Sequence, residues 1–133
     1  MLFAGCCGTA LHLACSLADP ELCSLLLGAG SDPSVVSEEG STILHYLAIS
    51  YVPEAADILA ELLDKHREKL DINAQDWEGC SALMKAAQAN DARQVELLLQ
   101  AGADKTLTEE NFGKNAFKIA EELAHEACMK LLT

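Results

Sequence analysis

The chain carries a short sequence pattern that returns at a nearly constant period. Its four copies share a hydroxyl or amide residue, a leucine or phenylalanine two residues later and an alanine near the end; they are residues 9–14 (TALHLA), 42–48 (TILHYLA), 81–87 (SALMKAA) and 115–120 (NAFKIA). The aligned positions Leu11, Leu44, Leu83 and Phe117 lie 33, 39 and 34 residues apart. A second pattern occurs twice, at residues 25–32 (LLLGAGSD) and 97–104 (LLLQAGAD). A period of this size predicts a stack of similar small units rather than one central core.

Each unit has the sequence signals of two short helices. Thr42 and Ser81 follow a glycine closely, and their hydroxyl groups can cap the first turn of a helix. The second helix of the first unit is expected to begin at Asp19 and Pro20, a cap followed by proline at a tolerated position. The second helices are expected to end at glycines, namely Gly28, Gly30 and Gly102. Because no unit can bury both of its faces alone, we predict an all-α solenoid of stacked helix pairs.

These patterns resemble the two signatures of the ankyrin-repeat family, Gly-x-Thr-Pro-Leu-His-x-Ala and Leu-Leu-x-x-Gly-Ala-Asp. The resemblance covers essentially the whole chain and implies one domain, residues 1–133, of helix-turn-helix pairs with short β-hairpin fingers. It implies four repeats, near residues 5–36, 37–75, 76–109 and 110–133. It also implies that the Thr hydroxyl and the His ring bond to each other, so we expect His12 and His45 to hold turns rather than to act in catalysis or bind metal.

The second repeat departs from the family pattern. It is six residues longer than the first, and its second helix is predicted to run from Pro53 to about Lys69. Three of the nine basic residues, Lys65, Arg67 and Lys69, lie at the far end of that helix. The cluster can be a solvated extension of the helix or a specific lateral contact.

Composition and charge exclude several classes of function. The chain has nine Lys and Arg residues and 21 Asp and Glu residues, which gives a formal net charge of −12. Because this charge repels polyanions, we expect no nucleic-acid partner. No uncharged run has the roughly 18 apolar residues of a membrane span, so we expect no membrane partner. Residues 1–18 are uncharged and include a lipoprotein-like segment, Phe3 to Cys6, but no basic segment precedes it, so export is not expected.

The cysteines and the missing catalytic motifs predict neither a metal site nor an enzyme. The chain has six cysteines, which form no C-x-x-C pair and lie at no zinc-finger spacing from the histidines: Cys6, Cys7, Cys15, Cys23, Cys80 and Cys128. We therefore expect reduced thiols in an intracellular protein, with Cys15, Cys23 and Cys128 packed as small apolar residues. The sequence has no phosphate-binding loop, nucleophile elbow or H-E-x-x-H motif, and we predict no catalytic residue and no cofactor. An enzyme or a metal centre remains the third hypothesis.

The resemblance also indicates where a partner protein binds. Proteins of this family use their concave face, which consists of the finger tips and the exposed side of the first helices. Carried over residue by residue, the tips are Glu38, Glu39, Trp77, Glu78, Asn111 and Phe112, and the first-helix positions are Ser41, Ile49, Ser50, Cys80, Gln88, Ala89 and Lys114. Aromatic residues beside carboxylates favour a partner with Arg or Lys together with apolar side chains. Alternatively, Trp77 or Phe112 folds down onto its own hairpin.

The first hypothesis for function is a non-catalytic, monomeric interaction module that binds another protein of basic or mixed character. We expect it in the cytoplasm or nucleus, or inside a host cell if the protein is a secreted effector. The second is a structural spacer or regulatory segment of a larger multidomain protein. Residues 9–27 resemble a repeat of the inhibitors of NF-κB transcription factors, and four repeats also resemble the small cyclin-dependent-kinase inhibitors, so an inhibitor is a further alternative.

The N-terminal segment does not have the polar face that caps a solenoid. It carries Leu2, Phe3, Cys6 and Cys7 ahead of the first repeat. Three explanations remain open: the chain is a fragment of a longer array, its end is covered by a partner, or the gene has lost its first repeats.

Overall fold

The computed structural model describes residues 9–133, and the uncapped positions Leu2, Phe3, Cys6 and Cys7 lie outside this range. Within it the chain forms α-helices, one short 3-10 helix and no strand. The helices are α1 (Ala10–Ser16), α2 (Pro20–Gly28), α3 (Ile43–Ala48), α4 (Glu54–Lys65), η1 (Arg67–Lys69), α5 (Ala82–Gln88), α6 (Ala92–Gln100), α7 (Ala116–Glu122) and α8 (Glu126–Leu132). The predicted all-α solenoid is confirmed.

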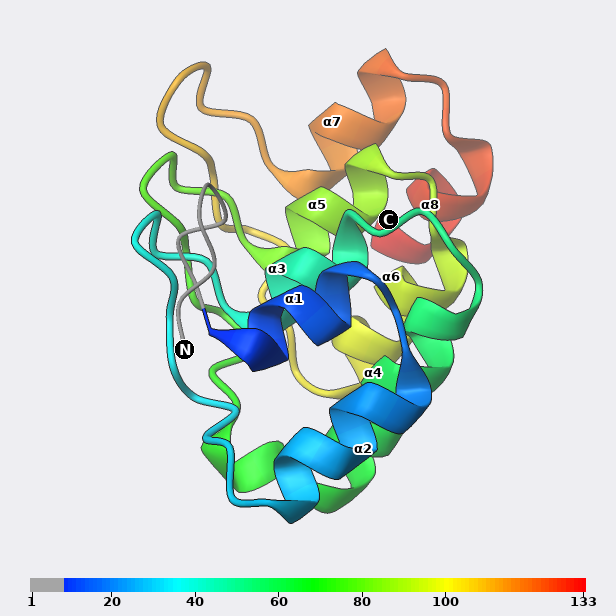
Figure 1. The fold of residues 1–133 in the computed structure, drawn as a ribbon. Coiled ribbons are helices and arrows are strands. Elements are labelled where there is room, and N and C mark those ends of the chain that lie inside the picture. The colour runs from blue at the N-terminus through cyan, green and yellow to red at the C-terminus, as the bar shows by residue number, and fades with distance from the viewer. Residues whose placement is uncertain (1–8) are drawn as a thin grey trace.

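The helices lie in two layers that run along the stack (Figure 1). Helices α1, α3, α5 and α7 contact one another in chain order, and α2, α4, α6 and α8 form the second layer in the same order. The loops that precede α3, α5 and α7 project from one side of the molecule, and we call them the fingers. The fingers are turns rather than the expected β-hairpins, because no strand pairing forms in the part of the chain that the structure describes.

Local capping starts the first helices, as the sequence predicts. The Thr42 N–H and hydroxyl both donate to Nδ1 of His45, at 3.0 and 2.9 Å, and Thr9 makes the same two bonds to His12. Ser81 takes the equivalent place at α5, where its hydroxyl oxygen accepts a bond from the Met84 N–H. The Thr-x-x-His sequence therefore contains both partners of its own cap.

The turns between and after the paired helices use left-handed backbone. Gly30 and Gly102 follow the second helices at φ +98° and +96°, as expected. Gly28 is the last residue of α2 but does not take this conformation. Within each helix pair, one residue other than glycine takes a positive φ; these residues are Ala18, Tyr51, Asn90 and Ala124.

The core is a continuous seam between the two layers. The leucines at the second position of the helical pattern, Leu11, Leu44 and Leu83, are each about 1% exposed. Small residues such as Ala14 and Ala120 are fully buried where the first helices face each other, which lets the backbones approach closely. The repeats therefore share one core that no single pair could form.

The second helix of the longer repeat is shorter than predicted. Helix α4 ends at Lys65, and the chain turns at His66 into η1 instead of continuing to Lys69. The Arg67 guanidinium donates to the carbonyl of Ala101, just past the end of α6. The basic cluster therefore includes a lateral contact, but one made within the chain, and this contact draws the segment off the helix axis.

Specific hydrogen bonds join the successive helix pairs. His45 Nε2 donates to the Cys80 carbonyl over 2.8 Å. The other ring nitrogen, Nδ1, accepts from Thr42. Comparable bonds run from Gln94 on α6 to Leu47 (2.9 Å), from His125 just before α8 to Ala87 (2.8 Å) and from Arg67 in η1 to Ala101. All four acceptors are main-chain carbonyls, and two of the four donors, His45 and Gln94, are buried, so a few side chains hold the neighbouring pairs in register.

Candidate functional site

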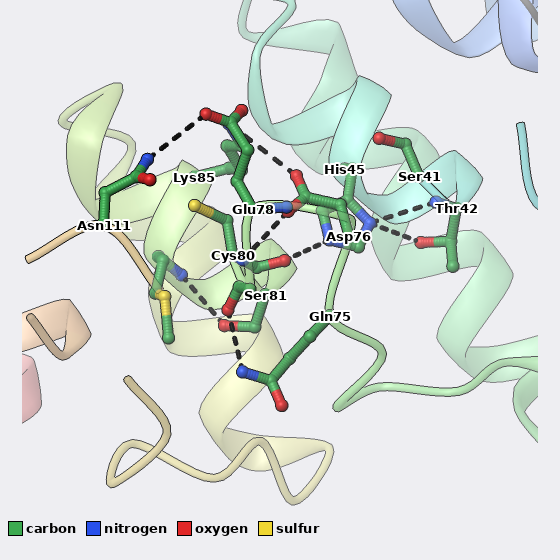
Figure 2. A network of polar contacts seen from close by, with 12 residues as sticks. Ser41, Thr42, His45, Gln75, Asp76, Glu78, Cys80, Ser81, Lys85 and Asn111 are labelled. Atoms are coloured by element: carbon green, nitrogen blue, oxygen red, sulfur yellow. Dashed lines mark hydrogen bonds and ion pairs between the residues drawn. The ribbon is translucent and has the colours of Figure 1, made fainter. Parts of the chain in front are cut away.

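Each finger is closed by one acceptor side chain at its base. Asp76 accepts bonds from the N–H groups of Glu78 and Cys80, both at 2.9 Å (Figure 2). Ser37 closes the preceding finger in the same way, through bonds of 3.2 Å from Glu39 and Ser41. These bonds fix the backbone of the tips before any partner arrives.

Glu109 performs this closing role in the third finger. Its carboxylate accepts from the N–H groups of Asn111 (2.8 Å), Phe112 (2.9 Å) and Lys114 (3.0 Å). The bond to the Lys114 N–H is the main cause that lowers the pKa of Glu109. Sequence reasoning missed Ser37, Asp76 and Glu109 as positioning residues, although an acidic or hydroxyl residue shortly before a finger glycine is a signal for such a turn.

The fingers are also bonded to one another. The Trp77 N–H donates to the Glu39 carbonyl (3.1 Å), and the Glu110 N–H donates to the Glu78 carbonyl (2.9 Å). The Trp77 ring packs on Gly40 of the preceding finger, where a Cβ would lie 2.8 Å from Trp77 Cδ1. Trp77 thus rests on its neighbour rather than on its own finger, and 71% of its surface remains exposed.

A first hollow of about 350 Å³ lies beneath the first two fingers. Four of the predicted residues line it, namely Glu39, Ser41, Ile49 and Glu78. Asp76 and Lys85 also line it, with 3.9 Å between the Asp76 carboxylate and Lys85 Nζ, and Tyr46 contributes an aromatic wall. The hollow therefore combines three carboxylates with one amine and an aromatic ring.

A second hollow of about 260 Å³ adjoins the third finger. Five of the predicted residues line it, namely Cys80, Gln88, Asn111, Phe112 and Lys114. Lys114 Nζ lies 4.7 Å from the centre of the Phe112 ring and 2.5 Å from the carboxylate of Glu122. Phe112 is 77% exposed, so Lys114 covers one part of the ring only.

The two hollows meet at the tips, where Asn111 Nδ2 lies 3.5 Å from Glu78 Oε2 (Figure 2). We call the surface of both hollows together with the three tips the finger face; it corresponds to the predicted concave face. Glu38 and Trp77 lie on the tips and do not line either hollow. Ala89 lines a separate hollow beside Tyr51, and the Ser50 hydroxyl donates to the Leu47 carbonyl, so the structure does not gather these two residues with the others.

Most of the positions assigned to the first helices lie beside them. Gln88 is inside α5, whereas the others precede or follow a helix: Ser41, Ile49, Ser50, Cys80, Ala89 and Lys114. The first helices have only six or seven residues, so their ends supply much of the surface next to the fingers. The assignment of these six residues to helices was wrong.

The two repeat histidines are structural groups by their surroundings. Burial lowers the pKa of His45, although the bond to the Cys80 carbonyl acts in the opposite direction. Burial lowers the pKa of His12 as well, although the nearby backbone of Ser41 and Val35 acts in the opposite direction. Both rings use Nδ1 to hold a threonine, which leaves them neutral near pH 7 and engaged in the cap.

Residues 9–133 contain neither a metal-binding cluster nor a membrane-spanning helix. No group of three or more His, Cys, Asp or Glu side chains in this range is arranged to hold a metal ion. No helix in the same range is both long and apolar enough to cross a membrane.

Comparison with known proteins gives one family. A family model described as "Ankyrin repeats (3 copies)" matches residues 11–109. The chain is 32% identical over 115 residues to the nuclear factor NF-kappa-B p105 subunit of Gallus gallus, covering 86% of this chain and 11% of that protein. It is 34% identical over 97 residues to human B-cell lymphoma 3 protein (72% and 21%) and 31% identical over 107 residues to the phosphocholine transferase AnkX of Legionella pneumophila (80% and 11%).

The chain therefore spans only between 11% and 21% of the length of these three relatives. Their names cover a nuclear-factor subunit and a phosphocholine transferase, so the matched segment occurs in proteins of different kinds.

Proposed function

Because the chain belongs to the ankyrin-repeat family, we propose that it is a non-catalytic module that binds a segment of another protein through its finger face. The observation that carries this proposal is the pair of adjoining hollows, which nine of the thirteen predicted residues line. The fingers are fixed by their own hydrogen bonds, so a partner meets a preorganised surface and little ordering free energy is lost on binding.

The charge of the finger face favours a partner segment with arginine or lysine. Glu39, Asp76 and Glu78 line the first hollow against Lys85 alone. In the second hollow Lys114 is already paired with Glu122, so it offers little to an anionic ligand. Excess carboxylate attracts a cationic side chain and raises the rate of association at low salt.

The aromatic residues supply the apolar part of the proposed contact. Trp77 and Phe112 are more than two-thirds exposed, and they lie on successive fingers. Exposed aromatic rings next to acceptors for arginine are typical of residues that dominate binding free energy. The partner segment therefore carries both basic and apolar side chains.

The proposal is tested with peptides selected on the whole chain from a random phage-displayed library. Glu39→Gln with Glu78→Gln removes two charges from the finger face, and Glu54→Gln with Glu96→Gln removes two exposed charges from α4 and α6 as the matched control. Selected peptides are expected to be rich in Arg, Lys and apolar residues. We expect the first double variant to bind them about tenfold more weakly and the control to bind as wild type does.

Selection of acidic peptides, or equal loss in both double variants, would contradict the proposed face. Binding that does not weaken between about 50 and 200 mM salt would contradict the electrostatic argument. A chain that selects no peptide would support the alternative of a spacer within a larger protein.

A second candidate function is regulation of an NF-kappa-B-type transcription factor. The specific support is that two relatives, from Gallus gallus and Rattus norvegicus, are by name p105 subunits of NF-kappa-B. Titration of the chain with purified NF-kappa-B subunits tests this candidate, and competition by the selected peptides would place the contact on the finger face. A kinase inhibitor is a weaker proposal, since no relative described above is named as one.

We further propose that the chain acts as a monomeric, intracellular protein and that residues 1–133 form one domain of four repeats. The four helix pairs support the repeat boundaries proposed from the sequence. Size-exclusion chromatography with light scattering tests the monomer.

A further inference from the structure

Two cysteines face each other inside the first helix pair. Cys15 lies on α1 and Cys23 on α2, and their sulfur atoms are 3.8 Å apart in a thiol–thiol hydrogen bond. Their side chains are almost completely covered, with 0% and 3% of their surfaces exposed. Both are free thiols in this structure. A disulfide needs the sulfurs to approach from this distance to about 2.05 Å.

A hollow between α2 and α4 leads to this pair. Its volume is about 220 Å³, and Cys23 lines it together with Pro20, Leu27, Ile58 and Leu62. A small molecule that entered the hollow would meet Cys23, whose sulfur lies 3.8 Å from that of Cys15. The two remaining described thiols lack this arrangement, since Cys128 contacts Asn90 Oδ1 and Cys80 lies beside the second hollow of the finger face.

The two thiols also differ in pKa, and Cys23, which lines the hollow, has the lower one. The hydrogen bond from Cys15 lowers the pKa of Cys23, although burial and the charges of Asp19 and Glu61 oppose the change. The same bond, followed by burial, raises the pKa of Cys15. Cys23 is thus the thiol that ionises first, and only the thiolate attacks a disulfide.

We propose that Cys15 and Cys23 form a reversible dithiol–disulfide site that reacts with low-molecular-weight disulfides entering between α2 and α4. The Cys23 thiolate attacks one sulfur of the small disulfide RSSR, forms a mixed disulfide and releases one thiolate, RS⁻. Cys15 then loses its proton to the released RS⁻ and attacks the Cys23 sulfur, which expels the second RS⁻. The products are the Cys15–Cys23 disulfide, one RSH and one RS⁻, so the small disulfide is reduced as the dithiol is oxidised.

The site is connected to the finger face through α1. His12 and Ser16 on α1 line the first hollow, and Ser16 is the next residue after Cys15. A bond between Cys15 and Cys23 would fix α1 to α2 and so hold this wall of the hollow in one position. This inference is independent of the partner proposed above, because it concerns the thiols themselves.

The test uses the full chain with Cys6→Ser and Cys7→Ser, so that only the four described thiols react. The native protein is incubated with oxidised and reduced glutathione at fixed ratios, quenched with acid, alkylated and mapped by mass spectrometry. We expect two thiols to disappear together, a mass loss of two hydrogens and a peptide that joins Cys15 to Cys23. Oxidation of the pair is expected to be at least about tenfold faster than modification of Cys128.

Two variants sharpen the result. Cys128→Ser removes another buried thiol and should leave oxidation of the pair unchanged. Cys15→Ser should stop the reaction at a mixed disulfide on Cys23. If this variant does not fold, the peptide map of the parent still decides the question. The proposal is overturned if the pair stays reduced in the native chain, if Cys23 of the parent ends as a stable mixed disulfide, or if the mapped bond joins other cysteines.

Discussion

Replacement of His45 by alanine tests how the second and third repeats are held together. The ring accepts from the N–H and hydroxyl of Thr42 and donates to the Cys80 carbonyl, and it is only 2% exposed. His45→Ala leaves the Thr42 N–H and hydroxyl without their acceptor, whereas the Cys80 carbonyl loses one of its two donors and keeps the Asp76 N–H at 2.9 Å. Each buried group left unpaired costs about 1–3 kcal/mol. Since the two Thr42 groups lose their acceptor and the Cys80 carbonyl stays bonded to Asp76, we expect a total loss of about 3 kcal/mol.

His12→Ala is the matched control for this substitution. His12 makes the same two bonds to Thr9, and although the backbone of Ser41 and Val35 lies near its ring, its Nε2 makes no hydrogen bond of ordinary geometry within the described residues. The bond that crosses to the next repeat is therefore lost in His45→Ala and not in His12→Ala. Urea unfolding followed by circular dichroism should give a difference of about 1 kcal/mol between the two variants. Equal losses, or a loss below about 1 kcal/mol for His45→Ala, would refute the reasoning.

The same ring makes stability depend on pH. Burial lowers the pKa of His45 below its ordinary value of 6.5, so the folded chain binds its proton less readily than the unfolded chain does. This contribution to stability is complete above pH 6.5 and is lost as pH falls from 6.5 towards the lowered pKa, with a limiting slope of about 1.4 kcal/mol per pH unit. Between pH 7.5 and 5, the free energy of unfolding should fall less steeply with decreasing pH for His45→Ala than for wild type. The same pH dependence in both proteins would contradict the prediction.

The remaining predictions concern finger packing, a buried amide and salt. Gly40→Ala forces a Cβ to within 2.8 Å of the Trp77 ring at φ +78°, and thermal unfolding should show a loss of about 1–3 kcal/mol that Trp77→Ala partly restores. Gly30→Ala, at φ +98° in open space, should show no such coupling to Trp77. Gln94→Leu removes the amide donor to the Leu47 carbonyl, but that carbonyl keeps the Ser50 hydroxyl as a donor, so urea unfolding should show a loss of only about 1 kcal/mol, and a loss of about 3 kcal/mol would contradict this reasoning. Surface plasmon resonance should show that added salt lowers the association rate of selected peptides more than it raises their dissociation rate.

The sequence predicts those parts of the fold whose partners are close in the chain. Thr42 and His45 are three residues apart, so the cap and the role of the ring follow from the pattern itself. Asp19 likewise accepts from Glu21 and Leu22 within one helical turn. The end of α4 depends instead on where Ala101 lies in the next repeat, 34 residues from Arg67, and no local pattern contains that distance. The predicted helix was too long for this reason.

The finger face shows the same division between local and distant causes. Glu39 and Glu78 were found because the finger glycines mark the tips. The position of Trp77 on Gly40 and the contact of Lys114 with Glu122 depend on packing between neighbouring units, which a single repeat does not specify. Burial of the Cys15–Cys23 pair could be anticipated from the apolar pattern, but the 3.8 Å between their sulfurs could not.

The four side-chain bonds between repeats require a particular side chain on the donating side but only a main-chain carbonyl on the accepting side. The acceptors at Leu47, Cys80, Ala87 and Ala101 are main-chain carbonyls, which every residue type carries. The hydrogen bond itself therefore places no demand on the type of the accepting residue, although Leu47, Ala87 and Ala101 are also buried and have to fit the core. In these four bonds only the donor has to be a particular side chain. A duplicated unit that brings its own donor can dock on a diverged neighbour, so such an array can gain units and drift in sequence without matched changes across every boundary.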